Sequence, residues 1–183
     1  VCTGGMLSQQ PGILAIIRKA HEFGKKVVAG GPDPTCQPDL YAEADYLVVG
    51  EGENTIPLFL EDLNRGLSSG TYLNSEPVDM SSSIVPRYDL IRFSDYLMMG
   101  MQYSRGCPFN CEFCNVSEIF GRKQRTKTIN QIINELQCLC KLGYRGHIFF
   151  IDDNFLANGK PVEELLISIA KWSENNNYPF YFQ

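Results

Sequence analysis

A cysteine-rich stretch occupies positions 104–114 and reads Ser104-Arg105-Gly106-Cys107-Pro108-Phe109-Asn110-Cys111-Glu112-Phe113-Cys114. Its cysteines have the spacing C-x3-C-x2-C and follow a strand-like run, so three thiolates on one loop can bind a single small cluster. Iron–sulfur clusters that only transfer electrons are usually held by four protein ligands. Three ligands leave one iron open to a substrate or cosubstrate. Cys107, Cys111 and Cys114 are therefore predicted to be the ligands of a [4Fe-4S] cluster.

Two other interpretations of these cysteines are possible. A structural zinc site needs four ligands, usually in C-x2-C pairs, and the only nearby candidate to complete one is His147, well outside the normal spacing. Three ordinary core cysteines would have no reason to lie in Gly-Cys-Pro and Cys-Glu-Phe-Cys contexts beside a turn. Spacing and context favour the cluster over both.

Strand and helix patterns alternate after the cysteines. Thr128 and Gln131 form a capping box that predicts the start of a helix, which stops at Gly143. The apolar run 147–151 predicts a strand ending on Asp152-Asp153-Asn154. Pro161 predicts another helix, and a further strand begins at 179–182. Residues 96–183 are thus expected to form two and a half β-α units, too few to close a barrel.

The first 66 residues show the same alternation. Short β-branched runs at 26–29 and 46–49 predict buried strands, each closed by a glycine-rich turn. Such alternation implies a parallel, doubly wound α/β sheet, whose earliest strands we expect to lie before Val1. Two helices are expected, one burying Ile13, Ile16, Ile17, Ala20 and Phe23 and ending at Gly24, the other burying Ile56, Leu58, Phe59, Leu60 and Leu63.

A stretch rich in glycine, serine and proline separates the two halves and lacks a helical or strand period. We therefore expect a domain at 1–66, a linker at 67–95 and a second domain at 96–183. The chain has no initiator Met and no signal-peptide pattern, which suggests part of a longer protein.

The stretch 104–114 resembles the cluster loop of radical S-adenosylmethionine (radical SAM) enzymes. Further stretches resemble the cobalamin-binding subgroup, and in particular hopanoid methylases and their unassigned relatives. These stretches are Gly30-Gly31-Pro32-Asp33-Pro34-Thr35, Gly50-Glu51-Gly52-Glu53, Tyr103-Ser104-Arg105-Gly106 and Phe149-Phe150-Ile151-Asp152-Asp153-Asn154-Phe155. The resemblance covers nearly the whole chain. It implies the C-terminal part of a flavodoxin-like cobalamin-binding domain, followed by the N-terminal part of a radical SAM (β/α) barrel.

The resemblance also assigns roles to several residues. It places Phe113 near the adenine of S-adenosylmethionine, and a polar group at Asp152 or Asp153 on its amine. A carboxylate suits a protonated amine, although a simple loop cap would use the same residues. Gly30 and Gly31 would allow close approach of the cobalamin nucleotide tail, whereas the pattern alone equally fits a turn that needs positive φ.

A basic run and four further cysteines lie outside the cysteine-rich stretch. Arg122, Lys123, Arg125 and Lys127 follow the cysteines, and their cations could favour an anionic cluster or form a solvated face. Cys2, Cys36, Cys138 and Cys140 are expected to be reduced packing residues.

Composition restricts the partners. A formal net charge of −5 gives no sign of nucleic-acid binding, and no apolar run approaches the length of a membrane span. Seven cysteines without a disulfide-like spacing suggest a reducing, cytoplasmic location. The expected partners are a small-molecule substrate and a reductant such as flavodoxin or ferredoxin.

The expected function follows from the resemblance. Reductive cleavage of S-adenosylmethionine would generate a 5′-deoxyadenosyl radical, and methylcobalamin would then methylate an unactivated carbon. A radical cyclase or rearranging enzyme without methyl transfer would share every motif. A non-catalytic iron–sulfur or zinc-binding protein is the second alternative, and it would need a fourth ligand that the sequence near the cluster does not supply.

Overall fold

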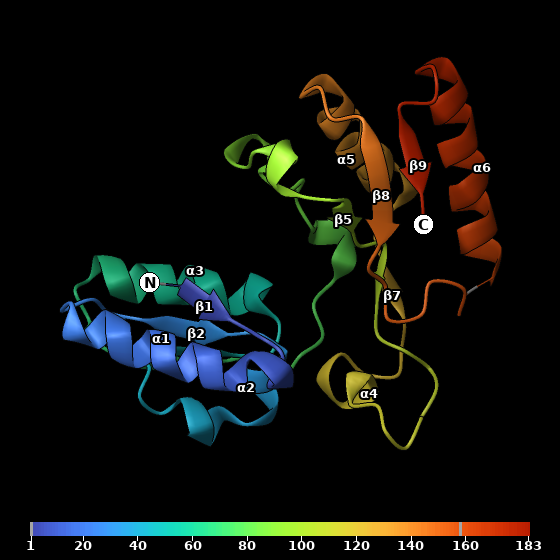
Figure 1. Ribbon diagram of the computed structural model, residues 1–183. Coiled ribbons are helices and arrows are strands. Elements are labelled where there is room, and N and C mark those ends of the chain that lie inside the picture. Colours follow the sequence, from blue (N-terminus) through green and yellow to red (C-terminus); the bar gives the residue numbers. More distant parts are fainter. Residues whose placement is uncertain (1, 158) are drawn as a thin grey trace. The chain divides into compact units, whose positions relative to one another are not determined.

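The computed structural model describes residues 2–157 and 159–183 and divides into two compact units, Val1–Val78 and Asp79–Gln183 (Figure 1). The division falls inside the stretch 67–95 where the sequence predicts a linker. That stretch is more ordered than expected, because it contributes a strand to the first unit and three short 3-10 helices to the second.

The first unit contains a parallel four-stranded sheet in which the strands lie side by side in sequence order. Its central pair is in direct register, with Ala29 opposite Leu47. The strands are β1 (Cys2–Gly4), β2 (Val28–Gly30), β3 (Tyr46–Val49) and β4 (Gly70–Leu73).

Helices cover both faces of this sheet, as the predicted doubly wound fold requires. Side chains alternate across β3, so Leu47 packs on one face with Ile17 of α1, whereas Tyr46 packs on the other with Phe59 of α3. The helical elements are η1 (Leu7–Gln9), α1 (Gln10–Glu22), α2 (Pro32–Cys36), η2 (Pro38–Tyr41) and α3 (Gly52–Asn64).

Three expectations for this unit were wrong in detail. Strand β1 was not predicted, and β4 extends the sheet into the expected linker; both strands are short and contain a glycine, so they lack a strand period. Ile16 of α1 and Phe23 at its C-cap are exposed, so the buried residues of the helix are the predicted Ile13, Ile17 and Ala20. The apolar residues of α3 expected to be buried are mostly exposed, at 43–54%, and only Phe59 is buried; the exposed ones are Ile56, Leu58, Leu60 and Leu63.

The second unit contains a parallel three-stranded sheet of order β5-β8-β9, with one long helix before β8 and another before β9 (Figure 1). The capping box at Thr128 opens α5 as predicted, and Leu136 and Ile148 are fully buried in a core shared by both helices. The elements are β5 (Met99–Met101), α5 (Ile129–Lys141), β8 (Gly146–Phe150), α6 (Gly159–Asn175) and β9 (Phe180–Phe182).

Shorter elements surround this sheet. Three 3-10 helices precede β5, and a two-residue antiparallel ladder follows it. No helix in the described part of the chain is long and apolar enough to cross a membrane. The short elements are η3 (Met80–Ser82), η4 (Tyr88–Leu90), η5 (Phe93–Asp95), β6 (Ser104–Arg105), α4 (Val116–Ile119) and β7 (Arg125–Thr126).

Candidate functional site

The three cysteines lie on one loop of the second unit, residues 106–124, which connects β6 to β7. We call it the cysteine loop. The antiparallel pairs of Ser104 with Thr126 and of Arg105 with Arg125 close its base. The loop thus starts just beyond β5, on the side where strands of a parallel sheet end and where ligand sites of α/β folds form.

Gly106 allows the two ends of this loop to touch. Its φ is +93°, and a Cβ added there would lie 2.8 Å from the carbonyl oxygen of Lys123. The adjacent Cys107 amide donates to the carbonyl oxygen of Gly121 at 3.2 Å. Any other residue at position 106 would therefore separate the two strands of the loop.

The thiols present the chemistry that an iron–sulfur cluster needs. Cys111 is exposed, Cys107 and Cys114 are half-buried, and the Cys114 amide donates to the Cys111 carbonyl oxygen at 3.0 Å. Soft thiolates on one short loop fit iron, although residues 2–157 and 159–183 contain no ready-made group of three His, Cys, Asp or Glu side chains around a metal position. The donor set fits the cluster, and the loop would have to gather its sulfurs around it.

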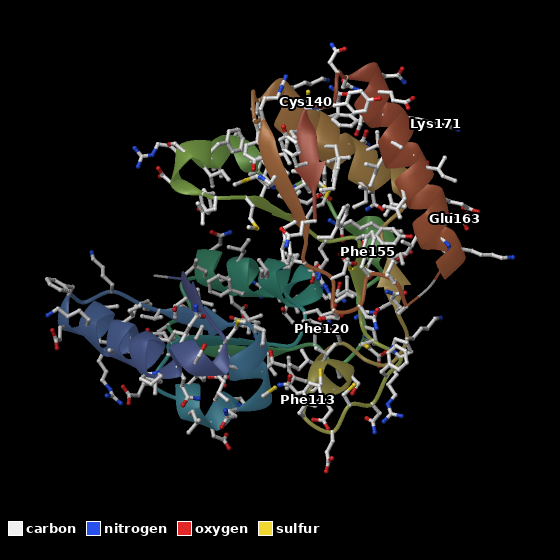
Figure 2. All side chains as sticks on the ribbon, turned by 45° about the vertical axis from the view of Figure 1, so that its right-hand side comes forward. Phe113, Phe120, Cys140, Phe155, Glu163 and Lys171 are labelled. Carbon is white, nitrogen blue, oxygen red and sulfur yellow. The ribbon has the colours of Figure 1, made fainter. Side chains whose placement is uncertain are left out.

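Phe113 is 94% exposed, and it lies just before α4 while Phe120 lies just after it (Figure 2). Exposure of so large an apolar ring leaves its face available to a planar ligand, which is compatible with the predicted contact to adenine.

Asp152 and Asp153 follow β8 as predicted, but their carboxylates already bind backbone groups near the cysteine loop. Asp152 accepts hydrogen bonds from the Tyr103 amide at 3.1 Å and from both the amide and the hydroxyl of Ser104. Burial raises the pKa of Asp152, although these hydrogen bonds oppose the shift. The exposed Asp153 accepts from the Gly106 amide at 2.9 Å through Oδ2. The pair therefore caps the loop, whatever else it binds.

Sequence reasoning missed two residues that take part in this arrangement. Asn154 directs its amide Nδ2 at the sulfur of Cys107, 3.9 Å away. Gln124 donates to the Ser104 hydroxyl at 2.9 Å and to the Asn154 carbonyl oxygen at 2.7 Å. The available signal was a polar run ending a buried strand, yet its partners lie 20 to 47 positions away and leave no periodic pattern.

Gly30 ends β2 and Gly31 is the N-cap of α2, and the fold constrains both positions. Gly31 has φ +104°, and a Cβ on Gly30 would lie 3.2 Å from the carbonyl oxygen of Val48. The turn with positive φ thus explains Gly31, whereas Gly30 has no positive φ and is constrained by its close approach to Val48; a role toward cobalamin stays a prediction for both.

The basic residues after the cysteines differ in their surroundings. Lys127 is buried and its ammonium group lies 2.6 Å from Glu135, so it is not directed at the loop, whereas Arg122 and Lys123 are exposed. Cys138 and Cys140 pack partly buried against the core of the second unit, as expected, whereas Cys36 is exposed and is not a packing residue. The side chain of Cys2 lies outside the described residues.

The chain is similar to several curated proteins over nearly its whole length. It is 43% identical to an uncharacterized methyltransferase of Synechocystis sp. over 100% of the chain and 34% of that protein. It is 37% identical to the hopanoid C-2 methylase of Rhodopseudomonas palustris over 97% of the chain and 34% of that protein. The chain thus spans about a third of the length of these relatives.

Solved structures share the fold at lower identity. The cobalamin-dependent S-adenosylmethionine radical enzyme OxsB, with aqua-cobalamin bound, superimposes with a TM-score of 0.74 at 19% identity, over 99% of this chain and 29% of that one. The radical S-adenosylmethionine methyltransferase TsrM from Kitasatospora setae gives 0.72 at 18% identity, over 93% of this chain and 38% of that one. Residues 101–180, which include the cysteine loop, match the radical SAM superfamily, so this segment is a radical SAM domain.

Proposed function

We propose that this chain is part of a radical SAM methyltransferase in which Cys107, Cys111 and Cys114 ligate a [4Fe-4S] cluster. The observation that carries the proposal is the C-x3-C-x2-C loop inside the segment that matches the radical SAM superfamily. When bound, such a cluster supplies the electron for reductive cleavage of S-adenosylmethionine, and a flavodoxin- or ferredoxin-type reductant would replenish it.

Cys107, Cys111 and Cys114 would hold three irons, and the iron without a protein ligand would be available to the amino and carboxylate groups of S-adenosylmethionine. Asp153 is the better candidate of the Asp pair to receive the amine. It is exposed, and its observed hydrogen bond uses only Oδ2, whereas both oxygens of Asp152 accept from the backbone. A carboxylate can accept further hydrogen bonds through its second oxygen.

Phe113 is proposed to cover the adenine ring. The residue precedes the third cysteine and exposes its ring, so it can stack on a flat ligand without rearrangement of the core. Stacking there would hold the adenosyl group next to the cluster.

Cobalamin-dependent methylation of an unactivated carbon in a small-molecule substrate is the reaction we propose. Support comes from the relatives, which include the hopanoid C-2 methylase, and from the first unit, whose doubly wound sheet places Gly30 and Gly31 at the end of β2. Ligands of open α/β sheets bind at these strand ends.

The test is anaerobic incubation of the complete protein with S-adenosylmethionine and dithionite. We expect 5′-deoxyadenosine, detected by chromatography and mass, together with about one bound hydroxocobalamin per chain. The matched control is Cys111→Ala, which should form no 5′-deoxyadenosine. Wild-type protein that forms no more 5′-deoxyadenosine than this variant would refute the radical reaction. Wild-type protein without cobalamin would refute methyl transfer alone and leave the radical cyclase or rearrangement as the function.

A further inference from the structure

The run Asp152-Asp153-Asn154 contacts the segment 103–107 in the same order along both stretches. Asp152 binds Tyr103 and Ser104, Asp153 binds Gly106, and Asn154 reaches the Cys107 sulfur. The two segments are 47 to 49 positions apart in the sequence. Nothing in a generic strand-end turn requires this ordered match.

Two further side chains, those of Phe155 and Gln124, hold the same segments together. The ring of Phe155 packs edge-on against Tyr103, with ring centroids 6.0 Å apart. It also packs at a tilt against Phe150 of β8, with ring centroids 4.7 Å apart. Gln124, at the far end of the cysteine loop, bonds both Ser104 and Asn154. The start and the end of the loop are therefore tied to one rigid strand end.

We propose that residues 152–155 form a strap that positions the cysteine loop, with Asp152 as its main positioning residue and Asn154 as a hydrogen-bond donor to the Cys107 sulfur. The relevance of the strap to a cluster rests on the proposed function, but the strap itself does not. Asp152 accepts from two amides and a hydroxyl, so its replacement leaves three donors without their acceptor. The role of the strap is to hold Cys107 in place before iron or S-adenosylmethionine binds.

The strap differs from a cosubstrate-binding pair in a measurable way. A residue that only binds S-adenosylmethionine has no effect on the loop when iron and cosubstrate are absent. Replacing a strap residue does affect the loop, because the loop then opens more often and exposes the Cys107 thiol.

The experiment measures maleimide labelling of the iron-free complete protein, with Cys111→Ser and Cys114→Ser so that Cys107 is the only loop thiol. Mass spectrometry follows Cys107, while Cys138 and Cys140 on α5 report general unfolding. In Asp152→Ala we expect Cys107 to label about ten- to a hundredfold faster, with Cys138 and Cys140 unchanged. The matched control is Glu163→Ala, which removes an exposed carboxylate on α6 and should match wild type. Wild-type labelling of Cys107 in Asp152→Ala would overturn the strap.

A milder pair of variants decides the question if Asp152→Ala also exposes Cys138 and Cys140. Asp153→Asn keeps an acceptor for the Gly106 amide, whereas Asp153→Ala does not. The strap predicts faster labelling of Cys107 in Asp153→Ala and wild-type labelling in Asp153→Asn, and equal labelling in both would overturn it. Iron content of reconstituted wild-type protein is measured separately, so a failure of the proposed cluster is distinguishable from a failure of the strap.

Discussion

The ammonium nitrogen of Lys127 lies 2.6 Å from Oε1 of Glu135, and both side chains are almost completely buried. The hydroxyl of Tyr88 donates to the other carboxylate oxygen at 3.4 Å. The Lys127 amide also donates to the Tyr103 carbonyl oxygen at 2.8 Å. This ion pair therefore joins the end of the cysteine loop to α5, and α5 to the segment before β5.

Replacing Lys127 with Met should destabilise the second unit strongly, because Glu135 would remain buried without its counter-charge. We expect a loss of about 3–5 kcal/mol in the free energy of unfolding. Lys127→Met combined with Glu135→Leu should recover most of it, since a pair of apolar residues is often as stable as a buried ion pair. Urea unfolding followed by the fluorescence of Trp172, the single tryptophan of the chain, measures both.

The control for this pair is Arg92→Ala, which breaks an exposed ion pair with Asp95 in the same unit. Its unfolding midpoint should hardly change, because solvent screens the pair. A single Lys127→Met variant as stable as wild type would show that the pair is not important for folding.

The stability of the first unit should fall as the pH falls below about 4, because of Asp33. Burial would raise the pKa of Asp33, but hydrogen bonds from Tyr41, Gln10 and Gln37 outweigh it and hold the pKa below its ordinary value. A carboxylate with a depressed pKa stabilises the fold above its unfolded pKa, and this contribution is lost as the pH drops through the folded value. Asp33→Asn should therefore be less stable than wild type at pH 7, and the difference should shrink towards pH 3. Circular dichroism during urea unfolding measures this, and a constant difference would contradict the assignment.

Gly31→Ala should destabilise the first unit independently of any cofactor. The φ of +104° lies where almost only glycine is found, and a Cβ there would lie 3.3 Å from the Gly5 amide nitrogen. We expect a cost of about 1–3 kcal/mol. Gly24→Ala is the matched control, with φ +63° but no neighbour within 4 Å, and should cost about 1 kcal/mol. Hydrogen exchange of β3 reports both, and a Gly31→Ala unit as stable as the wild type would leave cobalamin contact as the only reason for this glycine.

Phe113→Ala should weaken S-adenosylmethionine binding while leaving the fold and the cluster intact. The ring is almost fully exposed, so its loss costs the core nothing, whereas the proposed stacking is typically worth about 0.5–1.5 kcal/mol. Phe109→Ala, another exposed ring on the same loop, is the control and should bind the cosubstrate like wild type. Titration followed by the paramagnetic resonance of the reduced cluster measures affinity. Equal affinities of both variants would remove Phe113 from the site.

Much of the fold could be predicted because its signals are local. Strand β3 has the predicted bounds Tyr46–Val49, and the capping box at Thr128 and the glycine after α1 mark helix ends as expected. The short strands β1 and β4 escaped prediction because three or four residues containing glycine carry no period. Exposure of the apolar residues of α3 also could not be foreseen, since the run 56–60 is apolar at every position and does not reveal which of its sides the sheet covers.

The candidate site likewise contains features that the sequence predicts and features that depend on the fold. The C-x3-C-x2-C spacing is local, so the three cysteines were evident from the sequence alone. The partners of Asp152 and Asn154 depend on how β8 lies beside β5, which is a non-local property of the sheet. Sequence reasoning therefore selected the Asp pair as a candidate but could not determine what its carboxylates hold.

Iron and sulfide content after anaerobic reconstitution of the complete protein tests the central claim most directly. The account predicts about four irons and four sulfides per chain at this loop, because three thiolates and one open iron define a single cubane cluster. Cys107→Ala, Cys111→Ala and Cys114→Ala should each lose them, and the matched variants Cys138→Ala and Cys140→Ala on α5 should keep them. A normal cluster in Cys111→Ala protein would contradict the assignment of the cysteine loop.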